Sequence, residues 1–248
     1  MKRLFILSLF CAFFLAGQAQ SKDSIRVLFI GNSYTYFNDL PEMLRELGKT
    51  QKMNFAIGRV LKGGERFSGH LKNPKLRSVL KRQWDYVILQ EQSTIPAAPT
   101  AQVAKDVYPY AHTLDSLIHV DSPNAKVIFY MTWGHKHGTV HDKKGTYPLR
   151  DSYEGMQERL KTSYLEMTYE NNAWCAPVGM AWAKVHELYP SDHLYVQDTY
   201  HPSPKGSYLA ANVIFTTICQ KHYQSDYSAG LNTEMVEILQ QIAQNLLY

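Results

Sequence analysis

The feature that most constrains the fold is a short apolar segment, Ile25–Gly31, which is followed at once by Asn32 and Ser33. Its β-branched and aromatic residues, and the Gly-Asn pair at its end, are typical of a buried strand in a parallel sheet. Ser33 comes just past the carboxyl end of that strand, at the edge where open α/β sheets bind their ligands. Ser33 is therefore either a nucleophile or a turn residue that begins the next segment.

Strand-like and helix-like segments alternate along the rest of the chain. Apolar runs predict further strands at residues 53–60, 85–90, 126–132 and 174–178. Helical spacing and capping residues predict helices at residues 40–48, 101–118, 152–171, 180–188, 204–219 and 233–247, and a broken helical stretch at residues 71–80. This alternation indicates βαβ units, and hence a flavodoxin-like three-layer α/β/α sandwich with a parallel sheet of about five strands.

The first residues have the composition of a secretory signal peptide. Lys2 and Arg3 precede an apolar run at residues 4–15, and small residues follow up to Ala19. The apolar run is too short to span a membrane, so we expect cleavage near Ala19 and no stable membrane anchor. Residues 1–19 are thus a predicted signal peptide, and we expect an exported protein that is periplasmic or secreted. No linker-like stretch divides residues 20–248, which predicts a single domain.

Charge and cysteine content narrow the classes of partner and cofactor. The net charge of +4 falls to about +2 without Lys2 and Arg3, which is too small to indicate a nucleic-acid partner. Cys175 and Cys219 lie in apolar segments, which favours buried free thiols over a disulfide, although both states stay open. No cysteine and histidine spacing is typical of a zinc site, and we expect no metal or cofactor. The oligomeric state stays open.

Several of the predicted strands are followed directly by polar residues or glycines. Ser33, Gly63–Gly64 and the segment 91–93 each follow a strand, while Asp198 and His201 precede the last long helix but one. Because these loops meet at one edge of a doubly wound sheet, a serine, a histidine, an acid and amide donors can share one crevice. For Asp198 and His201, the alternative interpretation is a turn that leads into a helix.

These motifs together resemble those of the SGNH (GDSL-type) hydrolases, most closely a branch of exported bacterial proteins of undefined substrate. The family has its nucleophilic serine in a Gly-Asp-Ser or Gly-Asn-Ser turn, which Gly31–Ser33 matches. It has a glycine after the second strand, matched by Gly63–Gly64, and an Asp-x-x-His near the end, matched by Asp198–His201. The resemblance implies a catalytic triad of Ser33, His201 and Asp198, and an oxyanion hole that includes the N–H groups of Ser33 and Gly64.

The third family motif differs in this chain. The family usually has Gly-x-Asn-Asp, whose asparagine side chain donates to the oxyanion, whereas this chain has Gln90-Glu91-Gln92-Ser93. Gln92 falls on the asparagine position, and its amide can donate the same hydrogen bond from one methylene further out. Whether Gln92 is the third oxyanion donor stays open. Glu91 is interpreted as a residue that is partly exposed or has a hydrogen-bonding role, the alternative being a second acid.

The resemblance implies a serine esterase that needs no metal and hydrolyses a small O-acyl ester, O-acetyl included, through an acyl-enzyme. An exported location fits a carbohydrate substrate. Tyr34, Trp133 and Tyr200 are candidate substrate-binding residues, with simple packing as the alternative for each. The loop after the fourth strand, with His135, His137 and His141, is interpreted as a solvated loop rather than a metal site. Two other functions stay open: a non-catalytic glycan-binding protein on the same scaffold, and an acyltransferase.

Overall fold

The computed structural model describes residues 24–139, 150–191 and 194–246. The predicted signal peptide and His141 lie outside these residues. Five strands form one sheet: β1 (Ile25–Gly31), β2 (Phe55–Leu61), β3 (Tyr86–Leu89), β4 (Lys126–Tyr130) and β5 (Trp174–Ala176). All neighbouring strands are parallel, and their order is β2-β1-β3-β4-β5. This is the flavodoxin-like order, which confirms the predicted fold class.

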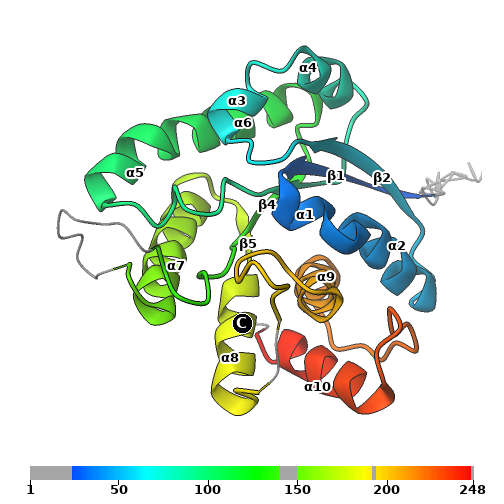
Figure 1. Cartoon of the computed structure of the whole chain (residues 1–248). Coiled ribbons are helices and arrows are strands. Elements are labelled where there is room, and N and C mark those ends of the chain that lie inside the picture. Colours follow the sequence, from blue (N-terminus) through cyan, green and yellow to red (C-terminus); the bar gives the residue numbers. More distant parts are fainter. Residues whose placement is uncertain (1–23, 140–149, 192–193, 247–248) are drawn as a thin grey trace, which may run out of the picture.

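Helices cover both faces of the sheet (Figure 1). The alternation of side chains along β1 divides the core, because Val27 and Phe29 face one side while Leu28 and Ile30 face the other. One face is covered by α2 (Leu40–Thr50), α8 (Val178–Leu188), α9 (Pro204–Cys219) and α10 (Thr233–Gln244). The other face is covered by α3 (Phe67–His70), α4 (Pro74–Leu80), α5 (Thr100–Asp106), α6 (Tyr108–Asp121) and α7 (Tyr153–Glu170).

The start of α9 was predictable from its capping residues. The Ser203 side chain accepts a hydrogen bond from the Gly206 N–H, and Pro204 occupies the first turn, where its missing N–H costs nothing. The helix packs against α2, α8 and α10, and nearly all of its residues are buried. It therefore fixes the position of the loop that precedes it, which carries Asp198 and His201.

Two local features differ from the prediction. The helix expected at residues 101–118 is divided into α5 and α6 at Val107, which has non-helical dihedral angles. Pro109 explains the division, because proline is tolerated in a first turn but breaks a helix interior. Between β1 and α2 the chain also forms α1 (Ser33–Tyr36) and the 3₁₀ turn η1 (Phe37–Asp39), which the sequence pattern did not predict. Within the described part of the chain, no helix has the length and hydrophobicity of a membrane span.

Candidate active site

Ser33 occupies the first position of α1, two residues after the end of β1, which is an interior strand of the sheet. Asn32 caps this helix, and its side-chain oxygen accepts a hydrogen bond from the Tyr34 N–H at 3.2 Å. The N–H of a first helical residue has no preceding carbonyl within its own helix, so the Ser33 N–H can bind an anion. β2 is added to the sheet on one side of β1, and β3 and the later strands are added on the other side. The order of the strands therefore reverses between β1 and β3. Ligands of such sheets bind at this point.

The side chain of Gln90 fixes the turn that presents Ser33. Its Oε1 accepts hydrogen bonds from the Asn32 N–H at 2.9 Å and from the Thr35 hydroxyl at 2.8 Å. Its Nε2 donates to Asn32 Oδ1 at 2.9 Å and to the Glu91 carbonyl. Gly31 allows this close approach, since a Cβ atom there would lie 2.7 Å from Gln90 Oε1. Sequence reasoning assigned Gln90 to the end of a strand and missed this role.

Asn32 links the loops that follow three different strands. Its Nδ2 donates to the Glu65 carbonyl, in the segment after β2, at 3.1 Å. The same nitrogen lies 3.5 Å from the Glu91 carbonyl, just after β3. The Asn32 side chain is 2% exposed, so these contacts are shielded from water. The strand-end loops are therefore held around Ser33 by one buried amide.

Asp198 and His201 lie in a tight loop before α9. Asp198 Oδ1 accepts hydrogen bonds from the Tyr200 N–H at 3.1 Å and the His201 N–H at 2.9 Å. Thr199 between them has a φ of 70°, a left-handed conformation that a β-branched residue rarely adopts. Pro202 keeps His201 out of the helical region. The Asp198 carboxylate thus folds the loop that brings the imidazole toward Ser33.

The three predicted triad residues meet in one hydrogen-bonded line. His201 Nε2 lies 2.8 Å from Ser33 Oγ, and His201 Nδ1 lies 2.6 Å from Asp198 Oδ2. Because an ionised carboxylate can only accept, the proton of a neutral imidazole is on Nδ1, and Nε2 accepts from the Ser33 hydroxyl. This is the arrangement in which histidine can remove the serine proton.

The pKa shifts of the titratable groups beside His201 agree with these protonation states. Partial burial acts to raise the pKa of Asp198, but hydrogen bonds from the His201 side chain and from two backbone N–H groups outweigh it and lower that pKa. Asp198 is therefore ionised at neutral pH. His135 lies nearby, and its burial, together with the proximity of His201, lowers its pKa to about 4. His135 is therefore neutral at pH 7 and adds no positive charge beside the His201 imidazole.

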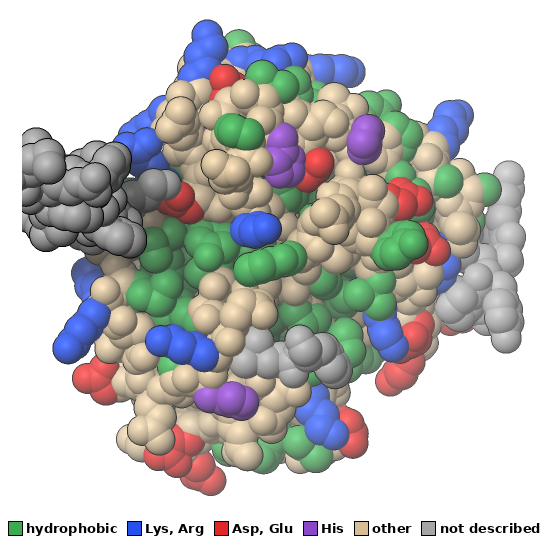
Figure 2. Space-filling model, turned by 180° about the vertical axis from the view of Figure 1, so that it is seen from behind, with side chains coloured by type: hydrophobic (Ala, Val, Ile, Leu, Met, Phe, Trp, Pro, Cys, Tyr) green, Lys and Arg blue, Asp and Glu red, His purple; other side chains and the backbone are tan. Residues whose placement is uncertain are grey.

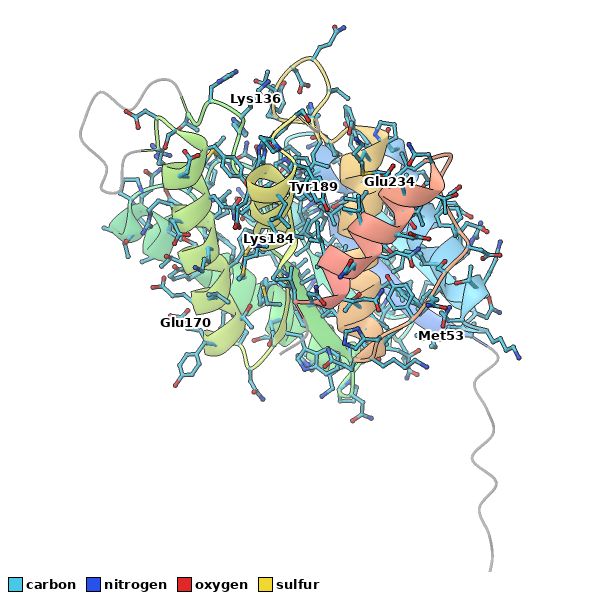
Figure 3. All side chains as sticks on the ribbon, turned by 90° about the horizontal axis from the view of Figure 1, so that it is seen from below. Met53, Lys136, Glu170, Lys184, Tyr189 and Glu234 are labelled. Atoms are coloured by element: carbon cyan, nitrogen blue, oxygen red, sulfur yellow. The ribbon has the colours of Figure 1, made fainter. Side chains whose placement is uncertain are left out.

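Segments on both sides hold the His201 loop in place. The Phe37 ring stacks on the His201 imidazole with a centroid distance of 4.2 Å and an interplanar angle of 2°. Asn38 Nδ2 donates to the Pro202 carbonyl at 3.0 Å. From the other side, the Lys136 N–H donates to the Thr199 carbonyl at 3.0 Å. Figure 3 shows Lys136 at the end of the molecule opposite Met53, which precedes β2, so the site lies at the carboxyl edge of the sheet.

The aromatic residues predicted to bind substrate divide into two groups. Tyr34 and Trp133 are 1% and 0% exposed, and their rings stack 4.6 Å apart. Trp133 also stacks on Trp182 and donates from Nε1 to the Tyr200 carbonyl at 3.0 Å. Packing covers both rings, which favours the alternative of simple packing for Tyr34 and Trp133 over contact with a substrate. Tyr200 is 38% exposed, and its ring centroid lies 4.4 Å from that of His201.

The candidate oxyanion residues Gly64 and Gln92 lie in the loops that adjoin Ser33. Gly64 has a φ of 65°, and the turn it forms leads to Glu65, which Asn32 binds. Gln92 Oε1 accepts from the N–H groups of Thr94 and Ile95, while its Nε2 donates to the Ser93 hydroxyl at 3.3 Å. The Gln92 side chain thus forms hydrogen bonds within its own loop. The second N–H of its Nε2 is left to donate a hydrogen bond to a substrate.

The structure also defines the surroundings of Glu91 and of the two cysteines. Glu91 has no exposed surface, so of its two expected roles the structure excludes partial exposure and confirms hydrogen bonding, through contacts to two N–H groups. Cys175 and Cys219 are free thiols. Within the described ranges, which exclude His141, no three His, Cys, Asp or Glu side chains are grouped closely enough to hold a metal ion.

No family model and no curated protein matches the sequence. Solved structures do match. A DUF4886 family protein from Bacteroides uniformis is 19% identical with a TM-score of 0.72, over 90% of this chain and 94% of that one. An acetyl xylan esterase from Geobacillus stearothermophilus is 18% identical with a TM-score of 0.55, over 81% and 97%. Phospholipase A1 from Streptomyces albidoflavus is 12% identical with a TM-score of 0.52, over 78% and 99%.

These identities are too low to carry an activity across, but the likeness covers most of each chain. The strand order and the position of Ser33 after the first strand agree with what the sequence motifs implied. This likeness shows the fold alone: the chain has the same fold as these solved structures, which include an acetyl xylan esterase and a phospholipase.

Proposed function

We propose that the protein is an exported serine esterase that hydrolyses small O-acyl esters, with O-acetyl groups on carbohydrate as the candidate substrate. The observation that carries the proposal is the hydrogen-bonded line from Ser33 Oγ through His201 to Asp198, with distances of 2.8 Å and 2.6 Å. A serine hydroxyl becomes a useful nucleophile when a neighbouring imidazole can take its proton. Asp198 holds the ring in the tautomer that leaves Nε2 free to do so.

The reaction proceeds in two acyl transfers. Ser33 Oγ attacks the acyl carbonyl while its proton passes to His201 Nε2. The N–H of Ser33, together with Gly64 and Gln92 as the proposed further donors, stabilises the negative charge on the carbonyl oxygen. His201 then protonates the leaving alcohol as its C–O bond breaks. A water molecule gives a proton to His201 and attacks the acyl-Ser33, which releases the acid and restores the hydroxyl. No step requires a cofactor.

Exposed aromatic rings around the triad support a carbohydrate substrate. Tyr36 is 43% exposed and packs on Phe37, whose ring lies on His201, while the exposed Tyr200 adjoins His201 from its own loop. Flat apolar rings with a hydroxyl at the tip suit the faces of sugars, which present C–H groups and hydroxyls together. The acetyl xylan esterase among the similar structures fits this class, although a phospholipase has the same fold.

The charge distribution gives no support for a nucleic-acid partner. Removal of the predicted signal peptide would leave a net charge of about +2. On the face seen from behind, hydrophobic side chains gather near the middle, and residues of both charge signs lie around them (Figure 2). The proposed partner is therefore a small ester or an acylated carbohydrate.

Hydrolysis of p-nitrophenyl acetate by the purified protein tests the proposal, with Ser33→Ala and His201→Ala as variants. We expect turnover in the parent and a loss of about 10³-fold or more in each variant, because triad members act as a unit. Acetate release from acetylated xylo-oligosaccharides then tests the substrate class. Saccharide binding without turnover would replace the esterase with a glycan-binding protein, and acyl transfer to an added alcohol in preference to water would indicate an acyltransferase.

A further inference from the structure

Glu91 is a buried carboxylate, directly after β3, that the proposed mechanism does not use. Its Oε1 accepts a hydrogen bond from the Gln92 N–H at 2.6 Å. Both of its carboxylate oxygens lie 3.1 Å from the Phe67 N–H. Burial of a carboxylate costs free energy unless its oxygens accept hydrogen bonds, and the N–H groups of Gln92 and Phe67 supply those hydrogen bonds.

The two donors belong to the two segments that carry the candidate oxyanion groups. Gln92 follows β3, and Phe67 begins α3, three residues after Gly64. The other end of α3 is held by His70, whose Nε2 lies 3.0 Å from the Gly31 carbonyl. The His70 nitrogen must donate there, because a carbonyl oxygen only accepts. The segment that contains Gly64 and α3 is thus fastened to β1 by His70 and to β3 by Glu91.

We propose that Glu91 is the positioning residue of the oxyanion hole: its carboxylate holds Gln92 and the start of α3 together, and so sets the spacing of the Gly64 and Gln92 donors. This inference rests on the proposed esterase function and gives Glu91 no contact with the substrate. Donors stabilise an oxyanion well only when they are held in place before the reaction, so a displaced donor lowers kcat with little effect on substrate binding.

The charges around Glu91 give this role a pH dependence. Burial raises the pKa of Glu91 to about 7, while its hydrogen bonds and the nearby Arg66 act to lower that pKa and Glu65 acts to raise it. Tyr164 faces it from α7, and burial raises the pKa of that phenol far above neutrality. Above pH 7 the ionised carboxylate of Glu91 can accept from both N–H groups. Below pH 7 one oxygen carries a proton and becomes a donor, so the link weakens.

Glu91→Gln tests the inference, because it keeps the size of the side chain but replaces one acceptor oxygen with an NH₂ group. Steady-state kinetics on p-nitrophenyl acetate would be measured for parent and variant from about pH 5.5 to 9. At about pH 8.5 we expect kcat to be about tenfold or more lower in Glu91→Gln, with KM within about twofold. At about pH 5.5 the two kcat values should converge, because the parent carboxyl is then protonated as well. A change of rate with pH that arises elsewhere in the site affects both proteins alike and cancels in their ratio.

Asp115→Asn is the matched control. Burial raises the pKa of Asp115 too, but it lies on α6, in a hollow lined by Lys126 and Trp174, the first residues of β4 and β5. It is therefore at the amino edge of the sheet, and its replacement should leave kcat unchanged at every pH.

Several outcomes would overturn the role of Glu91. One is a parent-to-variant ratio of kcat that does not change with pH, and another is a ratio of one at every pH. A third is a variant with a higher kcat than the parent, which would mean that the carboxylate repels the oxyanion. A parent with no Ser33-dependent turnover would instead refute the esterase itself. If Glu91→Gln does not fold, NMR titration of the parent remains: the amide signals of Phe67 and Gln92 should move together near pH 7, and independent behaviour would refute the link.

Discussion

Replacement of Gln90 by methionine should both destabilise the protein and slow its proposed reaction. Methionine keeps the length of the side chain but removes both amide atoms. The Asn32 N–H and the Thr35 hydroxyl then lose their buried acceptor, whereas Asn32 Oδ1 keeps its hydrogen bond from Tyr34. A buried donor without a partner costs about 1–3 kcal/mol, so two of them give an expected loss of about 2–6 kcal/mol in the free energy of unfolding.

The kinetic effect follows from the position of Asn32 beside the nucleophile. Misplacement of a reacting group by about 1 Å can cost about 10²-fold in rate. We therefore expect kcat for p-nitrophenyl acetate to fall by about 10- to 100-fold in Gln90→Met, with a smaller change in KM. Urea unfolding gives the stability, and the kinetics would be measured under conditions where the variant is folded.

Gln240→Met is the matched control for this prediction. Gln240 is a buried amide on α10 that donates to the Tyr208 hydroxyl at 3.0 Å and to the Ser225 carbonyl at 2.9 Å. Its loss should lower stability but leave kcat of the folded protein unchanged. A kcat within about twofold of the parent in Gln90→Met would refute the assigned role, as would equal losses of kcat in both variants.

Three further predictions concern the site. Asp198→Asn should lower kcat by about 10³–10⁴-fold, because an amide no longer fixes the His201 tautomer; a loss below about tenfold would remove Asp198 from the triad. Gln92→Ala should lower kcat by about 10²–10³-fold if its amide binds the oxyanion, and a change below about threefold would assign Gln92 to its loop alone. Burial raises the pKa of Glu91 from 4.5 to about 7, so the folded state binds this proton more tightly than the unfolded state. The free energy of unfolding should therefore fall by up to about 3 kcal/mol as the pH rises through this range, and urea titrations of Glu91→Gln should lack that slope.

The strands and long helices were predictable because each carries its own local signal. β1 is a continuous apolar run that ends in a glycine, and Ser203 and Pro204 mark the start of α9 by capping chemistry. The meeting of Ser33 with His201 was also predictable in outline, because strand-end loops converge at one edge of a parallel sheet. The division at Val107 was missed because helical periodicity continues through it, although Pro109 was the available signal.

Long-range contacts around the triad left little trace in the sequence. Gln90 looks like an ordinary polar residue at a strand end, and only the structure shows that its amide reaches back to Asn32. Phe37 stacks on His201 just before a kink at Asn38 and Asp39, both in the left-handed conformation, and no periodic pattern in the sequence predicts either feature. The burial of Trp133 depends on Trp182, which comes 49 positions later in the chain. Such contacts have no fixed spacing in the sequence.

Covalent labelling of Ser33 tests the central claim, that His201 activates this serine. The parent, Ser33→Ala and His201→Ala would be incubated with a fluorophosphonate, and the labelled peptide would be identified by mass spectrometry. An activated serine attacks the phosphorus, gives up its proton and displaces fluoride, which leaves it irreversibly modified, whereas a serine in an ordinary turn does not react. We expect label on Ser33 in the parent and none at that residue in either variant. An unlabelled parent, or equal labelling of Ser33 in His201→Ala, would contradict the account.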